Sequence, residues 1–100
     1  MTKLLQVDFD FDGPFGAEMA EAMADLAKSI NDEPGMIWKI WTEDRQNGKA
    51  GGIYIFEDEQ SAKAYLKMHT ERLEAMGIRG IRGLILDTND ALSAINRAPL

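Results

Sequence analysis

The chain has 100 residues, of which 45% are hydrophobic and 28% are charged, and its formal net charge is −6. This composition is ordinary for a globular protein and excludes extensive disorder, so we expect one domain over residues 1–100. The acidic charge argues against nucleic acids and anionic membranes as partners, because their phosphate groups are repelled by it.

The absence of cysteine from the sequence excludes disulfides, thiolate metal sites and cysteine nucleophiles. The first residues lack the long apolar core of a signal peptide, and no apolar run approaches the ~20 residues that cross a bilayer. We therefore expect a soluble, cytoplasmic protein.

The first 30 residues predict a strand followed by a helix. Apolar and polar residues alternate from Lys3 to Phe11, which is typical of a half-buried strand with Leu5, Val7, Phe9 and Phe11 on one face. A Gly-Pro turn follows, and apolar residues at helical spacing then predict one helix over Ala17–Ile30.

Two strands rich in β-branched and aromatic residues come next, over Met36–Glu43 and Gly51–Phe56. An Asn-Gly pair between them favours a hairpin loop. Asp58 is the expected N-cap of a second helix that runs to Met76, with Gly77 ending it. The remaining residues predict a fourth strand over Ile78–Asp87 and a short helix or turn over Asn89–Asn96.

The element order βαββαβ predicts a ferredoxin-like α+β fold, in which two helices cover one face of a four-stranded antiparallel sheet. The other face would carry apolar side chains that depend on the register: Trp38 or Trp41, Tyr54 or Phe56, and Leu84 or Ile85. An uncovered apolar face of this size is unusual in a monomer, so we expect a homodimer of sheets packed face to face.

Motifs across nearly the whole chain, in order and at matching spacing, resemble the YdhR-type mono-oxygenase family. The motifs are Gly13-Pro14-Phe15-Gly16, Pro34-Gly35, Trp38-Lys39-x-Trp41-Thr42-Glu43, Gly51-Gly52-Ile53-Tyr54-x-Phe56, Ser61-Ala62-x-x-Tyr65-Leu66-x-x-His69-Thr70 and Asn89-Asp90-x-Leu92-Ser93-x-Ile95-Asn96. The resemblance implies a dimeric α+β barrel. It also implies a mono-oxygenase that needs no cofactor and acts on a small hydrophobic aromatic or polyketide-like compound.

The aromatic side chains are the candidate substrate-binding residues. A mono-oxygenase without flavin or metal needs an apolar, aromatic pocket with few polar groups, where a base removes a proton from the substrate. The candidates for this pocket are Trp38, Trp41, Tyr54 and Phe56, with Tyr65 as a candidate catalytic residue. The same side chains would equally suit a packed dimer core.

His69 is the only histidine in the sequence and the second candidate catalytic residue. It would lie on the inward stripe of the second helix, where it could be a general base, a haem ligand or a buried histidine hydrogen-bonded to backbone. The haem-degrading relatives place an asparagine on the first strand, where this chain has Gln6 or Asp8, and a tryptophan near the position of Tyr65. Haem binding therefore fits less well.

Several alternatives stay open at this point. A non-catalytic protein could use the same cavity to bind a small hydrophobic molecule. Lys39 is interpreted as a residue at a strand edge rather than a cation in the pocket, and Gly51-Gly52 could allow a bulge or a close backbone approach. The alternating Asp8, Asp10 and Asp12 suggest a solvated strand edge rather than a metal site.

Overall fold

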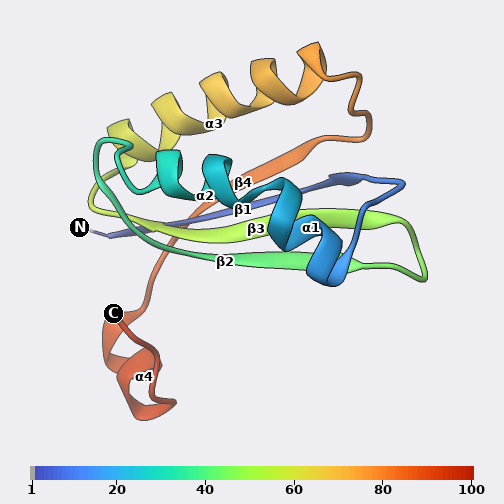
Figure 1. Ribbon diagram of the computed structural model, residues 1–100. Coiled ribbons are helices and arrows are strands. Elements are labelled where there is room, and N and C mark those ends of the chain that lie inside the picture. The colour runs from blue at the N-terminus through green and yellow to red at the C-terminus, as the bar shows by residue number, and fades with distance from the viewer. Residues whose placement is uncertain (1) are drawn as a thin grey trace.

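The structure, a computed structural model, describes residues 2–100 as a sheet with three helices on one face and a fourth helix on the other side (Figure 1). The strands are β1 (Lys3–Asp10), β2 (Met36–Asp44), β3 (Lys49–Phe56) and β4 (Arg82–Asp87). The helices are α1 (Gly16–Ala22), α2 (Ala24–Ile30), α3 (Glu59–Ala75) and α4 (Asp90–Ile95). Of the helices described, none has the length and apolar character needed to cross a membrane.

The sheet has the strand order β2-β3-β1-β4, and every neighbouring pair is antiparallel. Together with the element order, this confirms the predicted ferredoxin-like α+β fold. The central strand β1 pairs Leu5 with Tyr54 of β3 on one side and with Ile85 of β4 on the other.

The predicted single helix over residues 17–30 is wrong in its continuity, because the structure has two short helices that meet at Met23. Met23 leaves helical geometry at φ −103° and ψ 6°. The change of direction lets both short helices bury a residue, with Met19 of α1 at 7% exposure and Ile30 of α2 at 2%.

The second half of the chain follows the predicted capping signals more closely. Asp58 accepts a hydrogen bond from the Ser61 backbone N–H at 2.7 Å and so begins α3 as expected. Gly77 has φ +82° just after the helix, the left-handed conformation that favours glycine. The fourth strand begins at Arg82 rather than Ile78, because the Ile78 N–H bonds back to Leu73 O and closes the helix end.

The two faces of the sheet differ in whether helices pack against them. The helix-facing side carries Leu5, Val7 and Phe9 of β1, as predicted, and packs with Ala62, Tyr65 and Leu73 of α3 into the core. The opposite side, which we call the open face, has no helix packed along it in the described chain (Figure 1).

The expectation that Tyr54 or Phe56 would lie on the open face is wrong. Both are at most 1% exposed and contact α3, so strand alternation places Ile53 and Ile55 on the open face instead. On β4, Leu84 faces this side, since its neighbour Ile85 packs against the core.

A β-bulge decides which tryptophan lies on which face. Met36 pairs with Phe56 and Trp38 pairs with Ile55, so Ile37 is one extra residue in β2. Beyond the bulge, Lys39 pairs with Tyr54 and Trp41 with Gly52, which turns both side chains toward the helices. Trp38 lies on the open face.

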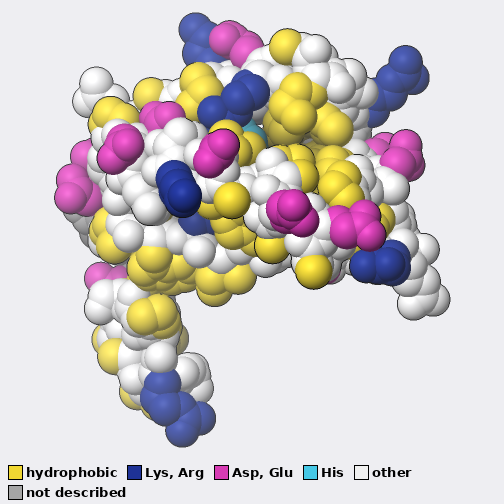
Figure 2. All heavy atoms as spheres, viewed as in Figure 1, with side chains coloured by type: hydrophobic (Ala, Val, Ile, Leu, Met, Phe, Trp, Pro, Cys, Tyr) yellow, Lys and Arg dark blue, Asp and Glu magenta, His cyan; other side chains and the backbone are white. Residues whose placement is uncertain are grey.

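The C-terminal residues form an arm on the open-face side. α4 projects below the sheet (Figure 1), and the Trp38 indole N–H donates to the Pro99 carbonyl at 2.9 Å. Figure 2 shows hydrophobic side chains along the lower edge of the body and along the arm. The large hydrophobic residues exposed here are Ile37, Ile40, Leu84, Leu86, Leu92, Ile95 and Leu100.

Candidate active site

Four ring side chains form a buried cluster between β3 and α3. The i, i+4 spacing of Tyr65 and His69 places their rings on one side of α3, where they stack at 5.2 Å between centroids. Tyr54 of β3 lies 5.0 Å from Tyr65 and 6.4 Å from His69, and Phe56 packs against Tyr65 at 5.4 Å. Four of the sequence-predicted site residues are thus in contact.

Arg72, one turn beyond His69, connects this cluster by hydrogen bonds. Its Nη2 donates to His69 Nδ1 at 2.9 Å and makes a longer contact of 3.5 Å to the Tyr65 hydroxyl. The Tyr65 and Tyr54 hydroxyls are hydrogen-bonded at 3.2 Å. Because a guanidinium has no acceptor, Nδ1 of His69 must be unprotonated, and the neutral ring carries its proton on Nε2.

Lys39 reaches the same region from β2. Its ammonium lies 3.5 Å from the centroid of the Trp41 ring and 4.6 Å from that of Tyr54. Gly52 makes room for it, since a Cβ there would lie 2.7 Å from Lys39 Cε. Gly51 serves the close backbone approach considered from the sequence, because a Cβ there would lie 2.0 Å from the Val7 carbonyl oxygen.

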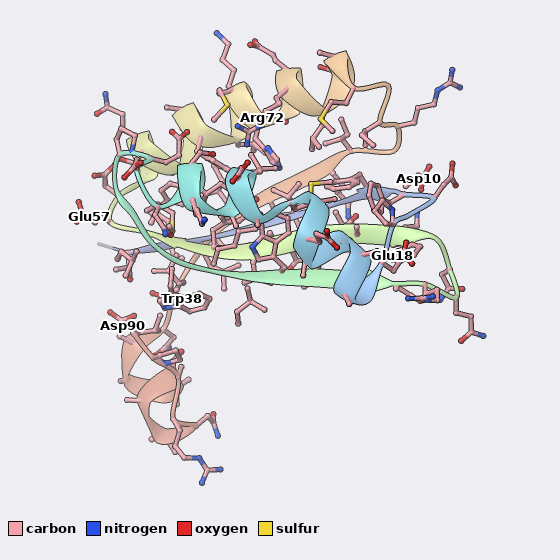
Figure 3. The ribbon with its side chains drawn as sticks, in the orientation of Figure 1. Asp10, Glu18, Trp38, Glu57, Arg72 and Asp90 are labelled. Atoms are coloured by element: carbon pink, nitrogen blue, oxygen red, sulfur yellow. The ribbon has the colours of Figure 1, made fainter. Side chains whose placement is uncertain are left out.

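Several of these polar side chains line a small cavity of about 40 Å³ between the sheet and the helices. Trp41, Tyr54, His69, Lys39 and Arg72 face it, and the rest of the lining is predominantly apolar, with Phe9, Met19, Met23 and Leu73 among it. In Figure 3 the labelled Arg72 extends from α3 toward α2 and the sheet. No acidic side chain is among the lining residues, all of which lie in the described part of the chain.

The cavity adjoins a larger groove along α1 and α2. The groove has a volume of about 370 Å³ and shares Met19, Met23 and Trp41 with the cavity. Glu43 at the end of β2 fixes one end of the groove, because both its carboxylate oxygens accept from the Gly16 N–H that begins α1, at 3.0 and 3.1 Å. Two flexible methionines and one tryptophan therefore separate cavity from groove.

Burial disfavours the charged forms of several titratable groups at the site. Burial, with smaller contributions from Arg72 and Lys39, lowers the pKa of His69 to about 3. Burial and the neighbouring Arg72 lower the pKa of Lys39 to about 7. Burial also raises the pKa of both Tyr54 and Tyr65, so their hydroxyls stay protonated at neutral pH.

The sequence-predicted site residues divide into three groups. Trp41, Tyr54 and His69 line the cavity, and Tyr65 and Phe56 pack behind Tyr54. Trp38 lies on the open face, beside the arm that carries α4 (Figure 3).

Arg72 was missed by sequence reasoning, although its spacing of three from His69 and seven from Tyr65 matches one face of a helix. Lys39 lies on an edge strand of the sheet, but its side chain faces the cavity, so the pocket interpretation is the correct one.

Two acidic side chains near the end of β1 form ion pairs with basic side chains. Asp8 pairs with Arg82 at 2.7 Å, and Asp10 pairs with Lys49. Within residues 2–100, the structure has no group of three or more His, Asp or Glu side chains placed to hold a metal ion.

Comparison with known proteins places this chain in a family. The family model described as putative mono-oxygenase ydhR matches residues 4–99. A search of curated proteins gave no match. Because the family match spans nearly the entire chain, the protein belongs to the putative mono-oxygenase ydhR family.

Proposed function

We propose that the protein is a cofactor-independent mono-oxygenase that acts on a small, enolisable aromatic or polyketide-like compound in the helix-facing cavity. The observation that carries this proposal is an amine, Lys39, whose pKa lies near neutrality, inside an enclosed aromatic lining. A substrate anion formed there would reduce dioxygen directly.

The proposed reaction converts an activated methylene carbon into a carbonyl. Two protons leave that carbon, one oxygen atom of O₂ bonds to it, the O–O bond breaks, and the other oxygen leaves as water. The substrate supplies all four electrons, so no further reductant is needed. The protein contributes a base, orientation and exclusion of water.

The polar and aromatic side chains at the cavity have distinct roles in this proposal. Neutral Lys39 accepts the first proton, because a pKa of about 7 leaves an unprotonated fraction of this amine near neutral pH. His69 is a poor base at a pKa of about 3, but its Nε2–H can donate to an oxygen of the substrate. Trp41 and Tyr54 form the walls, and Tyr65 acts as a positioning residue through Tyr54 and Arg72.

Access to the cavity requires Met19 and Met23 to move. A dry cavity of about 150 Å³ is needed to accept benzene, whereas the enclosed space here is about 40 Å³. The substrate ring would therefore extend into the adjoining groove of about 370 Å³. Methionine side chains rotate readily, which suits this position.

We also propose that the protein assembles as a homodimer through the open face. Ile40 is 54% exposed and Leu84 45%, and α4 extends from this side with Ile95 at 75% exposure. A second copy would cover both the sheet and the arm. Sedimentation should show a dimer that Ile40→Glu dissociates, while Met76→Glu on the helix side leaves it intact; a wild-type monomer would contradict this proposal.

The catalytic proposal is tested by oxygen consumption with anthrone, an enolisable aromatic ketone, and by detection of anthraquinone. We expect turnover by the wild type, its loss in Lys39→Met, and its retention in Lys63→Met, which removes an exposed lysine of α3. Saturable binding without oxygen uptake would favour the binding protein instead. A Soret band on titration with haem would favour a haem-binding protein instead.

A further inference from the structure

Two cations share the cavity with no acidic partner. Lys39 and Arg72 both line it, and none of the lining residues is an aspartate or glutamate. Across the described chain, the ion pairs involve Lys3, Lys49, Lys63 and Arg82, but neither of these two. In a chain with a net charge of −6, two half-buried cations beside one cavity are a costly concentration of positive charge.

Arg72 also has a donor that nothing satisfies. Its Nη2 serves His69 and Tyr65, but its Nε is buried and is the one buried side-chain nitrogen or oxygen in residues 2–100 without a hydrogen-bond partner. A buried donor without a partner is rare in native proteins and calls for an explanation, and a bound water, ion or ligand would supply the missing acceptor.

We propose that the cavity binds the anionic form of an acidic aromatic ligand, with its charged oxygen held by Lys39 and by the Arg72 Nε–H. The ring of this ligand would lie against Trp41 and Tyr54. This inference rests on the proposed function, because it specifies the substrate as one that is bound as an oxyanion, a phenolate or an enolate.

The contacts of Arg72 favour a single oxygen over a carboxylate. A carboxylate is usually bound by two parallel N–H donors of one guanidinium. Here Nη2 already bonds His69 and contacts Tyr65, so the Nε and Nη2 pair that would hold a carboxylate side-on is partly engaged, while Nε has no partner in residues 2–100. One oxygen atom of a phenolate can accept from Nε and from the Lys39 ammonium together.

The groups around Lys39 from each packed element agree with this assignment. Arg72 and His69 face it from α3, and Tyr54 faces it from β3. The lining from α1 and α2 consists of Met19, Met23 and Leu26, which carry no charge. An incoming oxyanion would therefore meet positive charge and hydrogen-bond donors without a competing carboxylate.

The test uses 4-nitrophenol, a coloured phenol that ionises near neutral pH. In solution slightly more acidic than its midpoint, added wild-type protein should increase the phenolate absorbance in a saturable manner. Nitrobenzene, the neutral analogue, should bind at least about tenfold more weakly, since hydrogen bonds to charged groups are among the strong ones. A parallel titration with 4-nitrobenzoate reports whether the site prefers phenolates, as expected, or carboxylates.

Matched variants separate the site from the general charge of the protein. Lys39→Met and Arg72→Gln should each weaken phenolate binding at least about tenfold, whereas Lys63→Met and Arg79→Gln remove exposed charges of the same kind and should leave it unchanged. Gly52→Ala keeps every charge but displaces the Lys39 side chain, and should also weaken binding.

The outcomes distinguish this inference from the proposed function. Phenolate binding that depends on Lys39 and Arg72, without any oxygen consumption, would retain the anion site and refute the mono-oxygenase. Equal affinity for nitrobenzene, or unchanged binding in folded Lys39→Met, would overturn the anion site. Lys39→Met should fold because it removes a buried charge, so the test stands even where Arg72→Gln does not fold.

Discussion

The two faces of the same four-stranded sheet show different chemistry. The helix-facing side buries the rings of Tyr54 and Phe56 almost completely, at 1% and 0% exposure, and it brings Lys39, His69 and Arg72 to a cavity. The open face is mainly aliphatic, and Ile40 is 54% exposed there. Buried polar groups that converge on a cavity indicate a ligand site, whereas an exposed aliphatic face without such groups suits assembly.

The largest expected difference between the faces is in folding stability. Phe56→Ala should lower the free energy of unfolding by about 3–5 kcal/mol, because it leaves a cavity in the core where this ring is fully buried. Leu84→Ala on the open face should cost the folded monomer far less, because this side chain is 45% exposed. Urea unfolding at one fixed protein concentration compares them; equal losses would remove the distinction.

The second expected effect is that the buried His69 on the helix-facing side makes folding stability depend on pH. The unfolded state binds a proton on His69 near pH 6.5, whereas the folded state does so only near pH 3. Between these values the unfolded state holds more protons, so stability falls as the pH is lowered. His69→Gln removes this contribution, which is roughly 3–5 kcal/mol across the window.

The readout for His69 is the difference in unfolding free energy between wild type and His69→Gln at each pH. That difference should change as the pH falls from about 7 to about 3, while any loss of packing in the variant stays constant. A difference that is independent of pH would mean that His69 titrates in the folded protein as it does in the unfolded one.

The smallest expected effect concerns the arm on the open face. Trp38→Phe removes the indole N–H that bonds to the Pro99 carbonyl, a hydrogen bond worth about 1 kcal/mol. Limited proteolysis should then cleave the C-terminal arm faster. Trp41→Phe, on the helix-facing side, should leave the cleavage rate of the arm at the wild-type value.

Much of the fold follows from local sequence signals. Alternation in β1 placed Leu5, Val7 and Phe9 inward, and Asp58 was identified as the cap of α3. These signals work because they depend on strand pleat and on hydrogen bonds within a few residues. The break at Met23 gave no such signal, since the helical spacing of apolar residues continues through it in the sequence.

The candidate site was predictable only in part, for a physical reason. Tyr54 and His69 were identified because aromatic and imidazole side chains are conspicuous in a sequence. The face on which Lys39 and Trp41 lie depends on the bulge at Ile37, and a bulge shifts every later residue of the strand to the opposite face. Arg72 gains its importance from contacts that exist only in the folded protein: its Nη2 bonds His69, and its buried Nε has no partner in residues 2–100.

The two tryptophans, one on each face, allow the most direct test of which side binds the ligand. Nitroaromatic compounds quench tryptophan fluorescence at short range, and Trp38→Phe and Trp41→Phe each leave one tryptophan as the reporter. We predict that 4-nitrophenol saturably quenches Trp41 in the Trp38→Phe protein, because Trp41 lines the cavity. Saturable quenching of Trp38 in the Trp41→Phe protein, with Trp41 unaffected in the other, would contradict this account.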